Sequence, residues 1–209
     1  MKFYLPGPVG KLEAWFERPE GEARGAAVVG HPHPLYGGTM RNTVVFRMAR
    51  ALRSAGLATL RFNFRGVEES EGVHDGEGAE ELDMSAGLDW LAGELPGSPL
   101  WAAGFSFGSR TAIGLATREA RIEALVAVAP PVRIYEIPEL NQIKQVGIIL
   151  MGSRDEFGTL SDLERQYPNL PAGLEAHEIE GADHLFRGKT PLVETTIEAY
   201  ASRNLEKSP

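Results

Sequence analysis

A serine placed between two glycines carries the strongest chemical signal in this sequence. Gly104, Ser106 and Gly108 form the pattern G-x-S-x-G, which follows an apolar stretch at 100–103 and precedes an amphipathic segment. A nucleophilic serine must project from a sharp strand-to-helix turn, and glycines two residues before and after it leave room for that backbone. The Phe107 amide, at the start of the helix, is the natural first donor to an oxyanion. The pattern therefore predicts that Ser106 is a nucleophile for acyl transfer.

The elements that must position this turn alternate along the chain. Apolar runs predict strands at 25–30, 57–62, 99–104, 124–129, 146–151 and 175–179, and helices are predicted at 42–55, 78–94, 107–120, 160–167 and 191–205. Such alternation indicates βαβ units and a parallel sheet. Two earlier runs, 2–5 and 11–16, flank a turn rich in Pro and Gly and predict an antiparallel edge. We expect one α/β domain that spans residues 1–209.

The composition narrows the classes of function and of partner. The formal net charge of −8, without a basic cluster, argues against a nucleic-acid partner. The chain has no cysteine, which excludes disulfides, thiolate metal sites and a cysteine nucleophile. No apolar run in 1–20 is long enough for a signal peptide or a membrane span. We therefore expect a cytoplasmic protein with neither a nucleic-acid nor a membrane partner.

Three motifs together resemble a known family. HPHPLYGGTM at 31–40, RFNFRG at 61–66 and GFSFGS at 104–109 are similar to motifs of the small, lidless bacterial hydrolases related to dienelactone hydrolase, within the α/β-hydrolase superfamily. The resemblance implies a three-layer α/β/α fold, a mostly parallel sheet and a triad in the order serine, aspartate, histidine. Residues 130–145 are too few for a lid domain, and residues 67–70 depart from the family pattern.

The resemblance also assigns the base and the acid that a serine nucleophile requires. His184, in the loop after the last predicted strand, takes the position of the superfamily's histidine. Asp155 follows the predicted strand that ends at Met151 and takes the position of the acid. Glu156 is the alternative acid. His177, in a predicted strand among charged neighbours, is expected to be exposed.

The second oxyanion donor is expected in the loop after the first central strand. Pro32 and Pro34 carry no N–H, so His31, His33 and Leu35 are the available amides. Resemblance to the superfamily's H-G-x pattern selects the His33 amide, and we expect no role for the His33 imidazole. The two histidines also suggest a metal site, but alternate residues of an extended segment point in opposite directions and no third ligand has suitable spacing. We therefore expect no metal.

Other charged residues have a structural interpretation beside a chemical one. The acidic stretch from Glu68 to Glu81 predicts a solvated loop that leads into a helix, and a carboxylate metal site supported by His74 is the alternative. Arg65 either pairs with a nearby carboxylate or holds an anionic substrate group. We expect Asp162 on a helix surface and expect Asp183 to stabilise its own loop.

The assembled prediction is a serine hydrolase that cleaves carboxylic esters or thioesters of short to medium acyl groups through an acyl-enzyme, without a cofactor. The expected partner is a small-molecule ester or thioester, and a homodimer is left open. Candidate apolar walls of the site are Leu35, Tyr36, Phe64, Phe105, Phe107, Phe157 and Phe186, several of which we expect in the core instead. The alternatives are a non-catalytic binding protein on the same fold, a peptidase and an acyltransferase.

Overall fold

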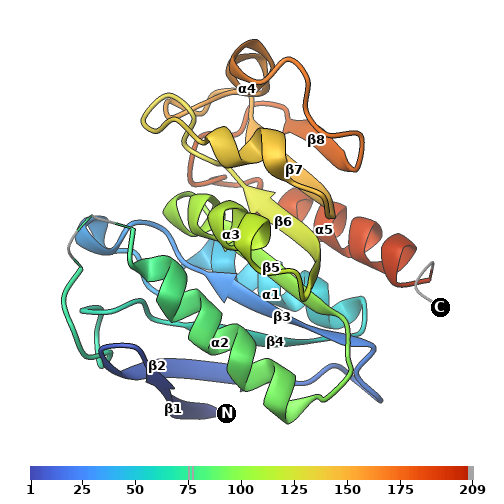
Figure 1. Cartoon of the computed structure of the whole chain (residues 1–209). Helices are drawn as coiled ribbons and strands as arrows, with labels where there is room; N and C mark the ends of the chain where they lie inside the picture. Colours follow the sequence, from blue (N-terminus) through green and yellow to red (C-terminus); the bar gives the residue numbers. More distant parts are fainter. Residues whose placement is uncertain (75, 77, 207–209) are drawn as a thin grey trace.

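The computed structural model describes residues 1–74, 76 and 78–206, and these residues form one sheet of eight strands (Figure 1). The strands are β1 (Lys2–Gly7), β2 (Gly10–Glu17), β3 (Gly25–Gly30), β4 (Leu57–Phe62), β5 (Leu100–Phe105), β6 (Ile122–Val128), β7 (Val146–Gly152) and β8 (Leu174–Ile179). Their order is β1-β2-β4-β3-β5-β6-β7-β8. β2 pairs antiparallel with β1 and β4, and the other neighbours are parallel. The expected mostly parallel sheet with antiparallel N-terminal strands is confirmed.

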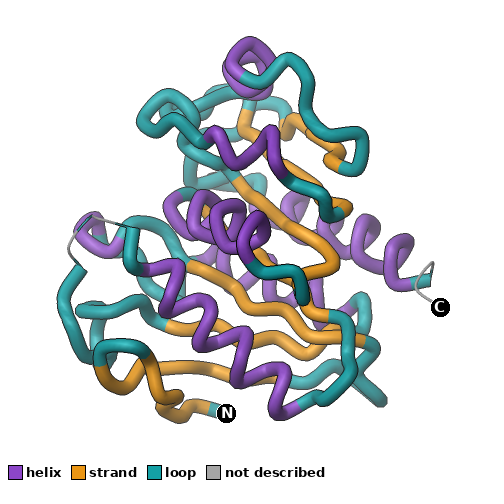
Figure 2. Tube along the Cα trace, in the orientation of Figure 1, coloured by secondary structure: helices purple, strands orange, loops and turns teal. Residues whose placement is uncertain are grey.

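Helices lie on both sides of this sheet (Figure 2). They are α1 (Thr43–Ser54), α2 (Glu80–Glu94), α3 (Phe107–Arg118), α4 (Leu160–Gln166) and α5 (Thr190–Leu205). α1 and α5 share one hydrophobic cluster with the sheet, and α2 and α3 share another, which confirms the three-layer α/β/α fold. In the described part of the chain, no helix combines the length and the apolar character that a membrane span requires.

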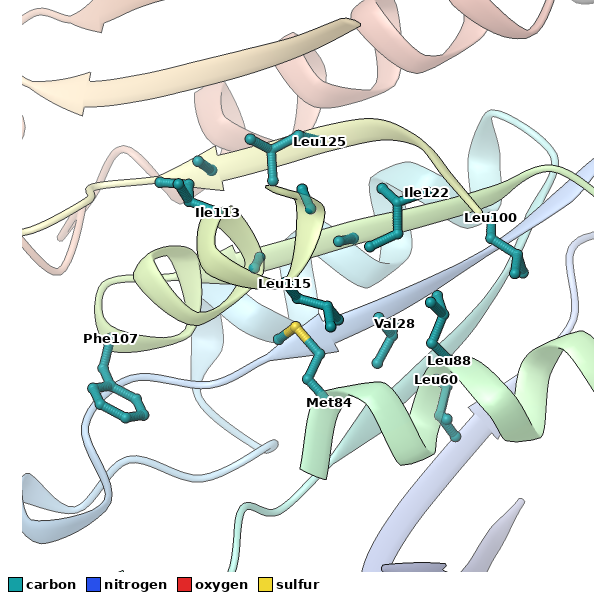
Figure 3. Packing of buried hydrophobic residues seen from close by; sticks show 14 of the residues in the cluster. Val28, Leu60, Met84, Leu88, Leu100, Phe107, Ile113, Leu115, Ile122 and Leu125 are labelled. Carbon is teal, nitrogen blue, oxygen red and sulfur yellow. The ribbon is translucent and has the colours of Figure 1, made fainter. Parts of the chain in front are cut away.

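The alternation of side chains along β3 explains why a continuous apolar run forms a central strand. All six residues of β3 are buried. Ala26 and Val28 belong to the cluster that α2 and α3 cover, whereas Ala27 and Val29 belong to the cluster that α1 and α5 cover. Figure 3 shows Val28 close to Met84 of α2 within the first cluster. Both faces of the strand are therefore apolar, as is expected for a parallel sheet between two helical layers.

Local capping determines where several elements begin and end. The side chain of Asn42 accepts a hydrogen bond from Val44 N at 2.8 Å and caps α1. Gly56 follows the end of α1 with a φ of 104°, which favours glycine. Residues 6–7 continue β1 instead of forming part of the turn. Predicted and observed boundaries differ by at most about two residues.

The acidic segment after β4 is attached to the sheet more firmly than predicted. Most of its residues from 68 to 73 are exposed, but Ser70 is buried. The Ser70 hydroxyl donates to Asn63 O at 2.7 Å and accepts from Glu13 N at 2.9 Å. The prediction of a solvated loop is wrong at this position because β2 supplies a partner. Residues 75 and 77 of the predicted segment lie outside the described residues.

The connection between β6 and β7 is short and leaves the strand ends uncovered. It spans residues 129–145, all of them described, and contains only the short 3-10 helix Pro138–Gln142. The prediction that the fold carries no lid domain is confirmed. Because β5, β6, β7 and β8 are parallel neighbours, their carboxyl ends lie at the same end of the sheet (Figure 1).

Candidate active site

Ser106 lies in the sharp turn between β5 and α3, with an unusual backbone conformation. Its φ is 54° and its ψ is −118°, a region that a residue with a side chain rarely adopts and that costs on the order of 1–3 kcal/mol. A Cβ on Gly104 would lie 2.0 Å from Gly108 O, and a Cβ on Gly108 would lie 2.5 Å from Gly30 O. Glycine at both positions is thus required by the close approach of strand and helix.

Hydrogen bonds hold the strained turn in place. Ser106 N donates to Val128 O at 2.8 Å. Ser106 O accepts from Ser109 N at 2.9 Å, from the Ser109 hydroxyl at 2.6 Å and from Arg110 N at 3.2 Å. Because the backbone N–H and the carbonyl oxygen of Ser106 are both hydrogen-bonded, the serine side chain projects from a fixed backbone.

Ser106, His184 and Asp155 form a continuous chain of hydrogen bonds. Ser106 Oγ lies 2.8 Å from His184 Nε2, and His184 Nδ1 lies 2.8 Å from Asp155 Oδ2. The second carboxylate oxygen, Asp155 Oδ1, accepts from Phe157 N at 2.8 Å. All three side chains are buried. With the carboxylate accepting from Nδ1–H, the neutral imidazole presents Nε2 as the acceptor for the serine proton.

Two loops bring the histidine and the carboxylate together. Asp155 follows β7, and His184 follows β8, the strand beside it. A Cβ on Gly152 would lie 2.5 Å from Ala182 O, so glycine allows the two loops to touch. Asp183 stabilises the histidine loop as predicted, since its side chain accepts from the backbone N of residue 187 at 3.0 Å. Parallel neighbouring strands therefore deliver both groups to the same edge.

Aromatic side chains enclose the imidazole of His184. The Phe157 ring meets it edge to face, with centroids 4.6 Å apart and an interplanar angle of 84°. The Phe105 ring lies 5.3 Å away at 32°. These contacts leave the ring little freedom to rotate, which keeps Nε2 directed at Ser106.

His33 and Phe107 carry the two backbone amides that the sequence predicts as oxyanion donors. Both residues line the same cleft as Ser106. Neither backbone N–H has an acceptor among the residues that the structure describes. The Leu35 amide, by contrast, donates to His33 Nδ1 at 3.2 Å. A Cβ on Gly38 would lie 2.0 Å from Pro32 O, so the loop turns back tightly at this glycine.

His31 has a structural role that removes it from the chemistry. It is fully buried, its Nδ1 lies 2.6 Å from Pro32 O, and its Nε2 accepts from Phe64 N at 3.0 Å. Burial lowers the pKa of His31 to about 4, so the ring is neutral and carries its proton on Nδ1. His31 and His33 thus differ completely in environment, although only one residue separates them.

The cleft beside Ser106 has a volume of about 350 Å³. Its lining comes from Ser106 and Phe107 and from residues within 32–42, 131–135, 156–157 and 184–187. Tyr36 and Phe157, two predicted wall residues, are among them. Asn42, Ile134, Tyr135 and Arg187 also line the cleft and were not predicted. The segment 131–135 follows β6, so its place at the sheet edge was the available signal.

Four other predicted wall residues do not line the cleft. Phe64, Phe105 and Phe186 are fully buried in the core. Phe105 is the last residue of β5 and packs against Phe186, with ring centroids 6.4 Å apart, in the cluster under α1 and α5. Leu35 is exposed and is not part of the lining. Strand alternation therefore directs Phe105 to the face of the sheet that α1 and α5 cover, although it precedes Ser106 in the sequence.

The remaining candidates fall outside the hydrogen-bonded chain. Glu156 is exposed at the cleft and is not bonded to His184, and His177 is exposed on β8. Arg65 pairs with the buried Asp83, at 2.7 Å from Nη2 to Oδ1, which confirms the structural interpretation. The expectation for Asp162 is wrong: it is buried and caps α4, and its hydrogen bonds with Thr159 hold its pKa well below the usual range.

The His74 side chain, assigned to the solvated loop or to a metal alternative, is instead buried beside the site. It forms a hydrogen bond with Glu80, the first residue of α2. Its ring lies 5.0 Å from the His33 ring and 5.7 Å from the Phe107 ring, measured between centroids. Sequence reasoning missed this arrangement because it joins three segments that are distant in the chain.

Comparison with known proteins agrees with the fold. Residues 36–206 match the model of the alpha/beta hydrolase domain family, and the chain belongs to that family. Family membership supports a hydrolase activity. A narrower kinship with dienelactone hydrolase stays a prediction.

Similar proteins come from several bacteria. An alpha-beta serine hydrolase homologue from Coxiella burnetii has a TM-score of 0.90 and 35% identity, with 96% of each chain covered. A serine hydrolase without lid from Xanthomonas campestris has a TM-score of 0.91 and 30% identity, with 100% of this chain and 96% of that chain covered. An uncharacterized protein of Rickettsia prowazekii is 34% identical, over 95% of this chain and 87% of its own length.

Proposed function

We propose that this hydrolase cleaves carboxylic esters or thioesters with Ser106 as the nucleophile, His184 as the base and Asp155 as the orienting acid. The observation that carries the proposal is the unbroken hydrogen-bond chain, with 2.8 Å at each of its two links. A serine hydroxyl is a weak nucleophile unless a base accepts its proton. The strained turn presents this hydroxyl at the cleft, where the substrate carbonyl can reach it.

Acylation follows from this geometry. Ser106 Oγ attacks the carbonyl carbon while its proton passes to His184 Nε2. The carbonyl oxygen gains the negative charge and accepts hydrogen bonds from the His33 and Phe107 amides. Asp155 stabilises the imidazolium, which then donates its proton to the departing alcohol or thiol. The product of this half-reaction is an ester between the acyl group and Ser106.

Deacylation repeats the same proton transfers with water. His184 Nε2 accepts a proton from a water molecule, whose oxygen attacks the acyl carbon. The second oxyanion occupies the same pair of amides. Collapse of this intermediate releases the acid, and His184 returns the proton to Ser106 Oγ. The open edge of the sheet gives water direct access to the acyl-enzyme.

The cleft supports short to medium acyl groups as substrates. Its volume of about 350 Å³ lies near the lower end of the range for ligand pockets, roughly 300–1,000 Å³. Phe107, Ile134 and Phe157 supply apolar surface, and Asn42 and Arg187 supply polar groups. No lid extends this surface over a long chain. A small ester or thioester therefore fits better than a lipid.

The test combines active-site labelling with a substrate panel. A fluorophosphonate is expected to label the wild type and not the Ser106→Ala variant. Ser54→Ala is the matched control, because Ser54 is exposed at the end of α1, away from the cleft. p-Nitrophenyl esters from acetate to palmitate and the matching thioesters then define the preference, with turnover expected to decrease at long chains.

The same experiment separates the alternatives. Absence of label on a folded wild-type protein would favour a non-catalytic binding protein. Faster cleavage of amides than of esters would favour a peptidase, and a product ester formed from an added alcohol in preference to the free acid would favour an acyltransferase. Equal turnover of acetate and palmitate esters would contradict the proposed chain-length preference.

A further inference from the structure

Three aromatic rings form a compact group behind the candidate oxyanion hole. They belong to His33, His74 and Phe107, and their centroids lie 5.0 to 5.7 Å apart in each pair. Two of the three residues, His33 and Phe107, contribute the amides proposed to hold the oxyanion. The third, His74, does not line the cleft. Any effect of His74 on the reaction must therefore pass through its two neighbours.

His74 is anchored by a buried glutamate. The exposed fraction of the side chain is 5% for His74 and 1% for Glu80. His74 Nδ1 forms a hydrogen bond with Glu80 Oε1, whereas Glu80 Oε2 is buried without a partner in the part of the chain that the structure describes. A buried carboxylate oxygen without a hydrogen-bond partner costs free energy, so the pair contributes little to stability. The arrangement points to a role in placing the His74 ring.

The His33 ring controls the conformation of its own loop. His33 caps the short 3-10 helix Pro34–Tyr36, and its Nδ1 accepts a hydrogen bond from Leu35 N. This bond requires Nδ1 to be unprotonated, and burial lowers the pKa of His33, with a further lowering from His74. The imidazole, for which the sequence predicted no role, therefore connects the ring group to the loop that carries the His33 amide.

We propose that His74, held by Glu80, is a positioning residue for the oxyanion hole: its ring wedges against His33 and Phe107 and keeps their amides directed at one point. The inference rests on the proposed function of Ser106. Oxyanion donors must lie about 2.7–3.1 Å from the developing charge, and a misplacement of about 1 Å can cost on the order of 100-fold in rate. Loss of the wedge should therefore lower kcat more than it changes KM.

Two kinds of variant test this role. His74→Ala removes the ring, and Glu80→Ala removes its anchor. Glu80→Gln is the conservative partner, because its amide oxygen still accepts from His74 Nδ1–H. His177→Ala is the control. His177 is exposed on β8, and its side chain pairs with Glu175 and not with a member of the ring group. All are compared in kcat, KM and thermal midpoint with a short p-nitrophenyl ester.

An inhibitor pair reports on the oxyanion hole itself. A short-chain trifluoromethyl ketone adds to Ser106 Oγ, passes the serine proton to His184 and leaves an oxyanion in the hole. The matched methyl ketone binds without forming one. We expect His74→Ala and Glu80→Ala each to lower kcat by about 10-fold. Each variant should also lower the affinity for the trifluoromethyl ketone by about 10-fold. KM and methyl ketone affinity should stay within about twofold, and Glu80→Gln should recover most of the loss.

The outcomes distinguish this inference from the proposed function. Turnover that survives in Ser106→Ala would overturn the proposed function itself. Suppose that Ser106→Ala is inactive. If His74→Ala then lowers the affinity for both ketones equally, or changes the affinity for neither ketone, the positioning role is wrong. A change in the pH dependence of kcat/KM would also contradict it, because that profile reports His184. If His74→Ala does not fold, the Glu80→Ala and Glu80→Gln pair decides.

Discussion

The two sides of the cleft are built on different principles. On the side of β7 and β8, Asp155 and His184 reach Ser106 with their own side chains, through bonds of 2.8 Å. On the side of β3 and β4, His33 offers a backbone amide, and its side chain is occupied with supporting the loop. In the proposed mechanism, one side transfers protons and the other stabilises the negative charge of the oxyanion. A catalytic side chain can be proposed from its residue type in the sequence. Any residue except proline has a backbone N–H, so a backbone donor can be recognised only from the contacts that position it.

The largest expected effect lies on the side-chain half. Ser106→Ala and His184→Ala should each reduce kcat for a short ester by about 10⁴-fold or more, because each removes a member of one proton-transfer unit. The double variant should be no worse than either single variant by more than a few-fold. Steady-state kinetics on all three proteins checks this, and additive losses would show that the two residues do not act together.

A slightly smaller decrease in kcat is expected for Asp155→Asn. The amide keeps the shape of the carboxylate, but it can present N–H to His184 Nδ1 and so stabilise the wrong tautomer. We expect a decrease in kcat of roughly 10³- to 10⁴-fold with the thermal midpoint little changed. Glu156→Gln is the matched control at the neighbouring carboxylate, since Glu156 is exposed and not bonded to His184. If Glu156→Gln lowers kcat as much as Asp155→Asn does, the assignment of Asp155 rather than Glu156 as the orienting acid is contradicted.

On the amide half, Gly38→Ala should have a moderate effect. The added Cβ would lie 2.0 Å from Pro32 O and 2.7 Å from His33 O, so the loop must shift. We expect kcat to decrease by about 10- to 100-fold while KM changes little, because the loop places an oxyanion donor. Gly93→Ala in α2 is the control, since nothing lies near its Cβ position. Normal kcat in Gly38→Ala would show that the loop's position is unimportant.

The smallest effect concerns stability and comes from His31. Its pKa is about 4 in the folded protein and about 6.5 in an unfolded chain, so the unfolded chain binds the proton first as the pH falls. Stability from this group is present above pH 6.5 and is lost toward pH 4, by on the order of 2 kcal/mol between pH 7 and pH 5. Urea unfolding at both pH values should show a smaller difference for His31→Gln. Equal differences would exclude this role.

The same contrast explains what could be predicted from the sequence. The strands and helices were predicted because both layers impose continuous apolar runs on the parallel strands, as in β3. Ser106 could be proposed from its glycine pattern, and Asp155 and His184 from their resemblance to the superfamily's chain order, in which each residue follows a strand. These features depend on local pattern and chain order, which a sequence contains directly.

The supporting structure could not be predicted in the same way. His74 and Glu80 become buried only when the loop after β4 and the start of α2 pack beside α3. Phe105 was expected at the cleft, but strand alternation turns it to the opposite face of the sheet. Asp162 was expected at a surface, whereas Thr159 and two arginines surround it. In each case the deciding contacts join distant segments.

A rapid-quench measurement tests the central claim most directly. Mixing the protein with excess p-nitrophenyl butyrate should release up to one p-nitrophenol per chain before steady turnover if deacylation is the slower step. Acid quenching followed by peptide mass analysis should then find a butyryl group on the peptide that contains Ser106. An acyl group on a different residue, or steady turnover by Ser106→Ala at the wild-type rate, would contradict the account.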